Sequence, residues 1–377
     1  MTGPAYPAAR AVAGKIQSHF ADHLADARRN GQDGLAPEPD AAAVEEIINA
    51  AFWASLRREE GYAPTISLAF LPPSNTALTF ERPLPLAPEA LAKLAPAVER
   101  PGIHLGVWRD GNDLSVWGTT RTIPKFCFVI EVIAPALLVI KHRRGEDSGK
   151  FVNVAVLEGD QAKVLNQDPT AMRDCPSLVT SLLGLESASS ASESVNVLVQ
   201  LAVSMRAHHR GGSLLMVPDN THSWQDSIVS PVLYSVSPPF SELAELMKED
   251  RSEMRQRRWQ DALRRVVDAI AGLTAVDGAT LITDRYHLLG FGVKIRRRRG
   301  GEPVERVIVT EPVEGAVADI ANPAQLGGTR HLSAAQFVHD QRDALAMVAS
   351  QDGRFTIFAW SPCEEMVHAH RVEALLL

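Results

Sequence analysis

The sequence predicts an α/β (α+β) fold in which a C-terminal mixed β-sheet flanked by helices follows a β-rich domain with a helical N-terminal segment. Three observations support this prediction. Apolar runs at strand spacing fill residues 98–170, two helix–glycine–strand units occur at 194–217 and 259–284, and the last third alternates helical and extended patterns. We therefore predict three regions: a helical, proline-rich region at 1–97, a β-rich region ending in a helix–strand unit at 98–240, and an α/β region at 241–377.

The N-terminal region predicts one helix followed by one strand. Apolar spacing predicts a helix over 40–61, with Asp40 as its N-cap and Gly61 as its stop. The run "ISLAFLPP" predicts a strand, and the proline-rich tract after it predicts a connection and a short helix. The N-terminus lacks the apolar stretch of a signal peptide.

The central region predicts an antiparallel sheet. Asp110-Gly111 is a hairpin signal between two alternating runs, and the segments "KFCFVIEV", "ALLVIKHR" and "FVNVAVLEG" predict three further strands. The longest apolar run, 127–140, is too short to span a bilayer and contains Pro135, so it predicts two strands joined at the proline.

The last third predicts helices alternating with strands. A helix over 259–273 has apolar residues on one face, and a second helix is expected near 333–341. Asp352-Gly353 predicts a hairpin between two apolar strands. The C-terminal tract from residue 361 predicts a polar helix.

Composition indicates an ordinary globular protein. Of 377 residues, 45% are hydrophobic and 22% are charged, and the formal net charge of -7 argues against a nucleic-acid partner. The three cysteines form no CxxC pattern, which is typical of a reducing compartment. We expect a cytoplasmic protein without a membrane segment.

Asp277, Gly278 and Ala279 form the first candidate binding motif. They lie where a helix turns into a strand, so backbone can approach a ligand at the glycine. The carboxylate of Asp277 can hold a metal or a ribose hydroxyl. A plain Asp-Gly turn explains the same residues.

The second candidate motif runs from Gly327 to His331. Gly327 and Gly328 allow backbone N–H groups to converge at a helix N-terminus, which favours phosphate. Thr329 and Arg330 can bind phosphate oxygens, and His331 can donate a hydrogen bond or take a metal. A glycine loop capped by Thr329 or by a serine is the structural alternative.

Ser350 and Gln351 form a third candidate position at the end of an apolar strand. Strand ends that line a cleft are typical ligand positions. A hairpin turn explains these two residues as well.

Taken in order, the three motifs resemble the diadenylate cyclase (DAC) domain over residues 241–377. That family has Asp-Gly-Ala at a strand start, Gly-Thr-Arg-His-Arg opening a helix, and a strand ending in Ser-Glu. The second arginine is Leu332 here, and the glutamate is Gln351. Both replacements remove a charged group that would hold phosphate or metal. The pattern is similar to the DAC-derived families of probable sensor domains, in particular the DACNV type.

The resemblance implies a nucleotide or dinucleotide sensor with a purine nucleotide or cyclic dinucleotide as its ligand. The expected ligand-binding residues are those of the three motifs, with Asp277 and His331 as candidate metal ligands. One alternative is an active diadenylate cyclase, in which Asp277 acts with Mg²⁺ or Mn²⁺ and Asp352 replaces the glutamate. Another alternative is a non-catalytic assembly protein. A homo-oligomer also follows from the resemblance, because DAC domains bring two active-site faces together.

Overall fold

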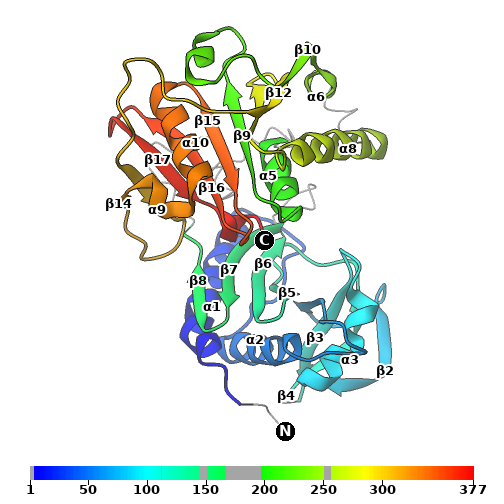
Figure 1. Cartoon of the computed structure of the whole chain (residues 1–377). Coiled ribbons are helices and arrows are strands. Elements are labelled where there is room, and N and C mark those ends of the chain that lie inside the picture. Colours follow the sequence, from blue (N-terminus) through cyan, green and yellow to red (C-terminus); the bar gives the residue numbers. More distant parts are fainter. Residues whose placement is uncertain (1–3, 112, 144–150, 167–196, 250–255) are drawn as a thin grey trace. The chain divides into compact units, whose positions relative to one another are not determined.

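The computed structural model describes residues 4–111, 113–143, 151–166, 197–249 and 256–377. It divides into two compact units, residues 1–165 together with 377, and residues 166–376. Each unit contains one large mixed sheet with helices packed against it (Figure 1). The predicted mixed α/β fold class is confirmed.

Three helices of the first unit pack on its sheet. They are α1 (Pro7–Arg29), α2 (Ala41–Ser55) and α3 (Pro88–Val98). The Asp40 side chain accepts a 2.7 Å hydrogen bond from the Ala43 N–H, which confirms the predicted N-cap of α2. Helix α2 ends at Ser55, earlier than predicted. Helix α1 was not predicted, although its Ile16, Phe20 and Leu24 follow helical spacing and are fully buried.

The first sheet has the strand order β2-β4-β3-β1-β5-β6-β7-β8. Its strands are β1 (Ile66–Phe70), β2 (Leu78–Pro85), β3 (His104–Asp110), β4 (Asp113–Thr120), β5 (Val129–Ala134), β6 (Leu137–Arg143), β7 (Phe151–Glu158) and β8 (Gln161–Val164). The hairpins β3–β4 and β5–β6 form where the sequence predicted them. Strand β1 pairs in parallel with β3 and antiparallel with β5, so the sheet is mixed rather than purely antiparallel.

The second sheet has the strand order β10-β12-β11-β9-β15-β16-β17-β13-β14. Its strands are β9 (Gly212–Val217), β10 (Tyr234–Phe240), β11 (Ala279–Thr283), β12 (Leu288–Val293), β13 (Val307–Thr310), β14 (Asp319–Ala321), β15 (Leu345–Ala349), β16 (Phe355–Ser361) and β17 (Met366–Arg371). The predicted β15–β16 hairpin is confirmed, with Ala349 opposite Phe355. The central strand β9 pairs in parallel with β11 and antiparallel with β15.

Helices cover both faces of the second sheet (Figure 1). The helices and short turns are α5 (Val197–Ala207), α6 (Glu242–Leu246), α8 (Arg257–Leu273), α9 (Pro323–Gly327), α10 (Thr329–Asp340) and the 3₁₀ turns Ser223–Ser227 and Glu373–Leu375. Helices α5 and α8 pack on the face that carries Leu214 and Ile282, and α10 packs on the face that carries Leu215 and Leu281. Neighbouring residues of one strand therefore serve two separate cores, as strand geometry requires.

The compact units divide the chain elsewhere than the three predicted regions. The boundary predicted after residue 97 cuts the first sheet, because β1 and β2 pair with strands beyond it. The boundary predicted after residue 240 cuts the second sheet, because β9 and β10 belong to it. Hydrogen bonding between strands that are distant in sequence, rather than local composition, determines the boundaries of the compact units.

The C-terminal tract is a strand and not the predicted polar helix. Residues 366–371 form β17, which pairs with both β16 and β13. Its His368 and His370 are buried despite their polarity. Neighbouring strands overrode the local preference of the tract. Within the described ranges, no helix is both long and apolar enough to cross a membrane.

Candidate functional site

Residues of two of the three predicted motifs, Asp277 to Ala279 and Thr329 with Arg330, line one pocket of the second unit. The pocket has a volume of about 340 Å³ and lies at the amino ends of β9, β11 and α10. Its lining residues are Ser213, Asp277, Gly278, Ala279, Val293, Lys294, Ile295, Thr329, Arg330 and Ser333. We call it the Asp277 pocket. Sheet pairing and the packing of α10 bring these separate segments together.

Asp277 faces solvent at the edge of this pocket and forms an ion pair. Its side chain is 94% exposed, and one carboxylate oxygen lies 2.7 Å from Nζ of Lys294. The hydrogen bond and positive charge of Lys294 lower the pKa of Asp277, and Arg330 adds to this effect. Asp277 is therefore ionised at neutral pH and already has a cationic partner.

Gly278 has a structural reason to be glycine. Its φ is +120°, and a Cβ built there would lie 2.4 Å from the carbonyl carbon of Gly292. The close approach of two backbones next to β11 therefore excludes a side chain. Ala279 is the first residue of β11 and is buried.

The first turn of α10 forms the other wall of the pocket. Gly328 is the N-cap residue, with a φ of +78° and no side-chain cap. The helix therefore begins at Thr329, and its first N–H groups have no acceptor within the helix. Arg330, one residue later, lines the same pocket as Asp277. The helix amino end and two cations make this wall favourable for an anion.

His331 is turned into the protein and does not line the pocket. It is 1% exposed, and its Nδ1 donates to the Gly327 carbonyl at 3.0 Å. Its Nε2 lies 3.4 Å from the Thr356 hydroxyl. A Cβ built at Gly327 would lie 2.3 Å from the imidazole, so this glycine leaves room for the ring. Burial is the main cause that lowers the pKa of His331, which keeps the ring neutral.

Ser350 and Gln351 lie beside the Asp277 pocket and outside its lining. The Gln351 amide lies 3.5 Å from the Arg210 carbonyl, at the limit for a hydrogen bond. The Ser350 N–H donates to the Arg354 carbonyl within the turn between β15 and β16. A Cβ built at Gly211 would lie 3.0 Å from Arg330 Nη1 and 3.5 Å from Gln351 Cγ. Gly211 therefore lies between Arg330 of the second motif and Gln351 of the third.

The residues of the Asp277 pocket do not by themselves fit a divalent metal ion. Magnesium and manganese require several oxygen ligands. The lining supplies one carboxylate, which is paired with Lys294 and accompanied by Arg330. Both ring nitrogens of His331 have polar neighbours. The arrangement suits an anionic ligand better than a cation.

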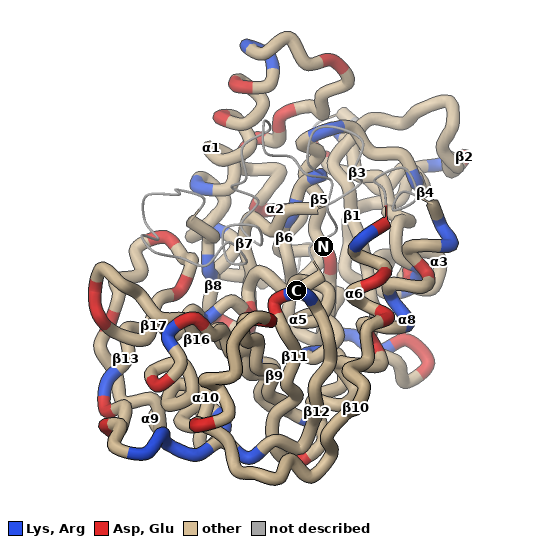
Figure 2. The backbone as a smooth tube through the Cα atoms, turned by 90° about the horizontal axis from the view of Figure 1, so that it is seen from above, with Lys and Arg blue, Asp and Glu red and all other residues tan. Residues whose placement is uncertain are grey.

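Sequence reasoning missed Lys294, which lies directly after β12. Its backbone carbonyl accepts a 2.8 Å hydrogen bond from Val229 N–H, so the residue is held in place. The available signal was a lysine directly after the apolar segment "LLGFGV". The four arginines at 296–299 made this single lysine hard to recognise. Lys and Arg are interspersed with Asp and Glu along most of the chain in Figure 2. The two cations that line the Asp277 pocket, Lys294 and Arg330, are therefore a local feature.

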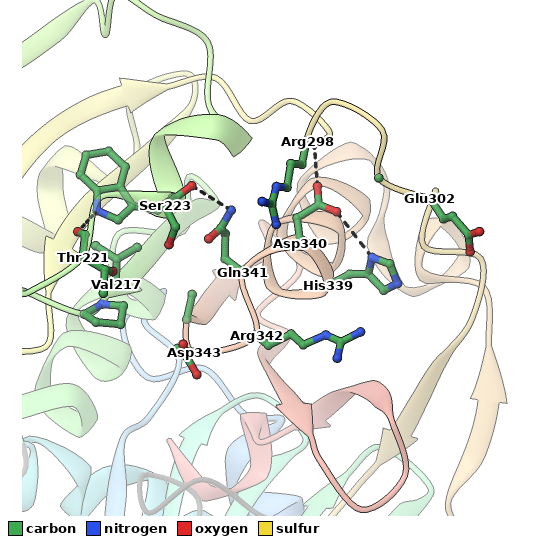
Figure 3. A pocket seen from close by; sticks show the side chains of 14 residues that line it. Val217, Thr221, Ser223, Arg298, Glu302, His339, Asp340, Gln341, Arg342 and Asp343 are labelled. Atoms are coloured by element: carbon green, nitrogen blue, oxygen red, sulfur yellow. Dashed lines mark hydrogen bonds and ion pairs between the residues drawn. The ribbon is translucent and has the colours of Figure 1, made fainter.

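A second pocket of about 410 Å³ lies at the carboxyl ends of β9 and α10 (Figure 3). Its polar groups bond to one another: Asp340 accepts from the Arg298 N–H at 2.8 Å, and the Gln341 amide donates to the Ser223 carbonyl at 3.1 Å. The carboxyl end of a helix disfavours anions. This pocket is therefore a poorer phosphate site than the Asp277 pocket.

A third pocket, of about 460 Å³, lies in the first unit next to α3 and β1. Glu59, Glu60 and Glu99 contribute carboxylates to it, against the single cation of Lys93. Excess negative charge also disfavours phosphate there.

Comparisons with known proteins give a family model for one segment and solved structures of low similarity. No curated protein matches the sequence. Among solved structures, the chain is similar to one described as the crystal structure of the hypothetical membrane spanning protein from Bacillus cereus. The identity is 14% and the TM-score is 0.27, over 51% of this chain and 68% of that one.

Residues 33–121 match the model of a family described as "Probable sensor domain DACNV". The matched segment includes α2, β1, β2, α3, β3 and β4 and lies in the first unit. The sensor-domain part of the predicted resemblance is confirmed there, outside the 241–377 range in which the motifs were recognised. Residues 33–121 are therefore similar to a probable sensor domain.

Proposed function

We propose that this chain is a sensor whose second unit binds a purine nucleotide or cyclic dinucleotide in the Asp277 pocket, without cyclising it. One observation carries the proposal. Two motifs that are far apart in sequence, at 277–279 and 329–330, line one pocket with two cations and a helix amino end. The match of residues 33–121 to a probable sensor domain supports the sensory part.

Phosphate oxygens would lie over the first turn of α10. Arg330 supplies a planar pair of donors for two oxygens of one phosphate, and Thr329 offers a hydroxyl and a backbone N–H. Lys294 adds a point charge once its pairing with Asp277 is relaxed. The sugar and base would extend toward Val293 and Ile295, the apolar part of the lining.

The local chemistry of three residues argues against cyclisation of the nucleotide. Leu332 has no charge to offer a phosphate, and Gln351 has none to offer a metal. Asp352, which could have replaced the missing carboxylate, is paired with Arg354 at 3.3 Å. Joining two nucleotides depends on positioned charge, and that charge is depleted here.

Calorimetry on the untagged full chain tests the proposal, with ATP, ADP, cyclic di-AMP and cyclic di-GMP as probes, with and without Mg²⁺. We expect one probe to bind with a Kd in roughly the micromolar range. The substitution Arg330→Ala should weaken that binding about 10- to 100-fold, because it removes a charge-assisted hydrogen-bond donor. Arg298→Ala alters an exposed arginine of the second pocket and should leave affinity unchanged.

Absence of binding by every probe to the folded chain contradicts the proposal. Formation of cyclic di-AMP from ATP and metal, lost in Asp277→Asn, supports the cyclase alternative. A chain that binds none of the probes and whose stability is little changed by Arg330→Ala supports the assembly alternative.

A further inference from the structure

Three histidines of the first unit come together away from every pocket described above. His19 and His23 are four residues apart on α1, which places them on one face of the helix. His142, near the end of β6, is buried beside them. One nitrogen from each ring can be chosen so that all three lie within 4.8 Å of one another.

Hydrogen bonding fixes which nitrogen of two rings carries the proton. His23 Nδ1 lies 3.0 Å from the His19 carbonyl, and His142 Nδ1 lies 3.3 Å from the Arg143 carbonyl. A carbonyl oxygen only accepts, so both Nδ1 atoms are donors, and in the neutral form of each ring Nε2 presents a lone pair. Metal-binding histidines show this arrangement, with one nitrogen bonded to a carbonyl and the other facing the ion.

His19 provides a second and independent indication. Its Nε2 is buried and has no hydrogen-bond partner among the described residues. Leaving a buried polar nitrogen without a partner is unfavourable, and such groups are rare in folded proteins. A metal ion bound by this nitrogen would satisfy it.

Burial, together with the neighbouring His23 and His142, lowers the pKa of His19 to about 3, so this ring is neutral at physiological pH. A neutral imidazole at physiological pH can bind an ion without first releasing a proton.

The surroundings favour a transition metal over calcium or magnesium. Phe20 and Phe126 lie against the His142 ring, with centroids 5.9 and 5.2 Å away. The cluster supplies nitrogen donors only, which suit zinc, copper and nickel, whereas magnesium and calcium prefer oxygen.

We propose that His19, His23 and His142 form a binding site for a divalent transition-metal ion, with zinc as its first expected occupant. Three nitrogens at zinc bond lengths of about 2.0–2.1 Å lie roughly 3.3 Å apart in a tetrahedron, so the rings must close slightly around the ion. His19 and His23 are half-buried, which leaves them free to do so. The fourth position is left for water or an anion, and the ion ties α1 to β6.

Zinc titration of the untagged full chain against a competing chelator tests this proposal. We expect one zinc per chain with a Kd below about 1 µM. The variant His23→Ala should bind more than about 100-fold more weakly, because even the loss of an outer-shell partner weakens known sites about 10- to 100-fold. The matched control His222→Ala removes an exposed histidine of the second unit and should bind zinc like the parent chain.

Two measurements use the unaltered chain, so their outcome does not depend on whether a variant folds. Cobalt bound in place of zinc should show the intense visible absorption of a tetrahedral site. Zinc at a hundred times its Kd should raise the melting temperature of the first unit by roughly 5–10 °C. The proposal is overturned if the folded parent chain binds neither zinc nor cobalt with a Kd below about 10 µM. It is also overturned if the zinc affinity is unchanged in both His23→Ala and His142→Asn. The nucleotide experiments use other probes and another unit, so either proposal can fail alone.

Discussion

Gly278 shows how a single backbone position limits the second unit. The predicted role of this glycine was close approach to a ligand, whereas its φ of +120° and the nearby Gly292 already exclude a side chain. We expect Gly278→Ala to lower the free energy of unfolding by about 2–4 kcal/mol, from backbone strain and overpacking together.

Urea unfolding followed by circular dichroism measures this effect. Gly272→Ala is the matched control, because Gly272 is an exposed glycine within α8 and a Cβ added there would have no atom within 4 Å. The control should be stabilised by about 0.5–1 kcal/mol, as alanine favours a helix. Equal stability of the two variants would contradict this explanation.

We expect His370 to make the second unit sensitive to acid. Burial, with help from His368, lowers the pKa of its imidazole from 6.5 to about 3, and Nδ1 lies 2.7 Å from the Thr310 hydroxyl. Between these two pH values the unfolded chain binds more protons than the folded chain. The free energy of unfolding should therefore fall as pH drops below about 6.5, by up to about 1.4 kcal/mol per pH unit.

Denaturation at pH 7, 6, 5 and 4 tests this dependence against His370→Asn. Asparagine keeps a polar atom near the position of Nδ1 and removes the titrating group. The variant should show a shallower loss of stability on acidification. Parallel curves for the two proteins would assign the acid sensitivity to other groups.

At the scale of elements, the amino end of α2 depends on Asp40. Its carboxylate caps the helix at Ala43 N–H and also pairs with Arg109 of β3. We expect Asp40→Ala to lower the free energy of unfolding by about 1–2 kcal/mol, mainly through the lost cap. Asp40→Asn keeps the cap and removes only an exposed ion pair, so it should cost less than about 1 kcal/mol. If thermal or urea unfolding shows the same loss of stability for both variants, the ion pair and not the cap is the main contribution of Asp40.

Local signals in the sequence predicted some elements and not others. Asp110-Gly111 and Asp352-Gly353 gave both hairpins, because turn chemistry is local. Helix α1 was missed because alanine, charged residues and two histidines obscure the apolar spacing of Ile16, Phe20 and Leu24. Strand β17 was predicted as a helix because only its neighbours β13 and β16 determine its conformation.

The candidate sites show the same division. The motifs at Asp277 and Arg330 were visible in the sequence, whereas Lys294 and the burial of His331 depend on tertiary packing. The histidine cluster escaped prediction because its ligands come from a helix and a strand that are far apart in the sequence. The i, i+4 spacing of His19 and His23 was the only local sign of it.

At the scale of the whole molecule, the first unit contains a complete sheet and its own core. All eight strands of that sheet and three helices lie within residues 1–165. The segment 33–121 that matches the sensor-domain family ends before β5, which pairs with the buried strand β1. This segment alone would expose the apolar edge of β1.

We therefore expect a fragment of residues 1–165 to unfold cooperatively in urea and a fragment of residues 33–121 to aggregate or unfold without a transition. Circular dichroism and size-exclusion chromatography distinguish these outcomes. A cooperative transition in the shorter fragment would show that the matched segment folds without β5–β8 and α1.

The pairing of β9 also determines the order in which the second unit can assemble during synthesis. Leu215 of this central strand pairs with Ala346, which the ribosome adds only after most of the intervening unit has emerged. One edge of β9 must therefore wait for β15, and contacts between such distant positions are slow to form. A nascent chain paused before residue 345 would have an incomplete central sheet and would be a natural substrate for chaperones.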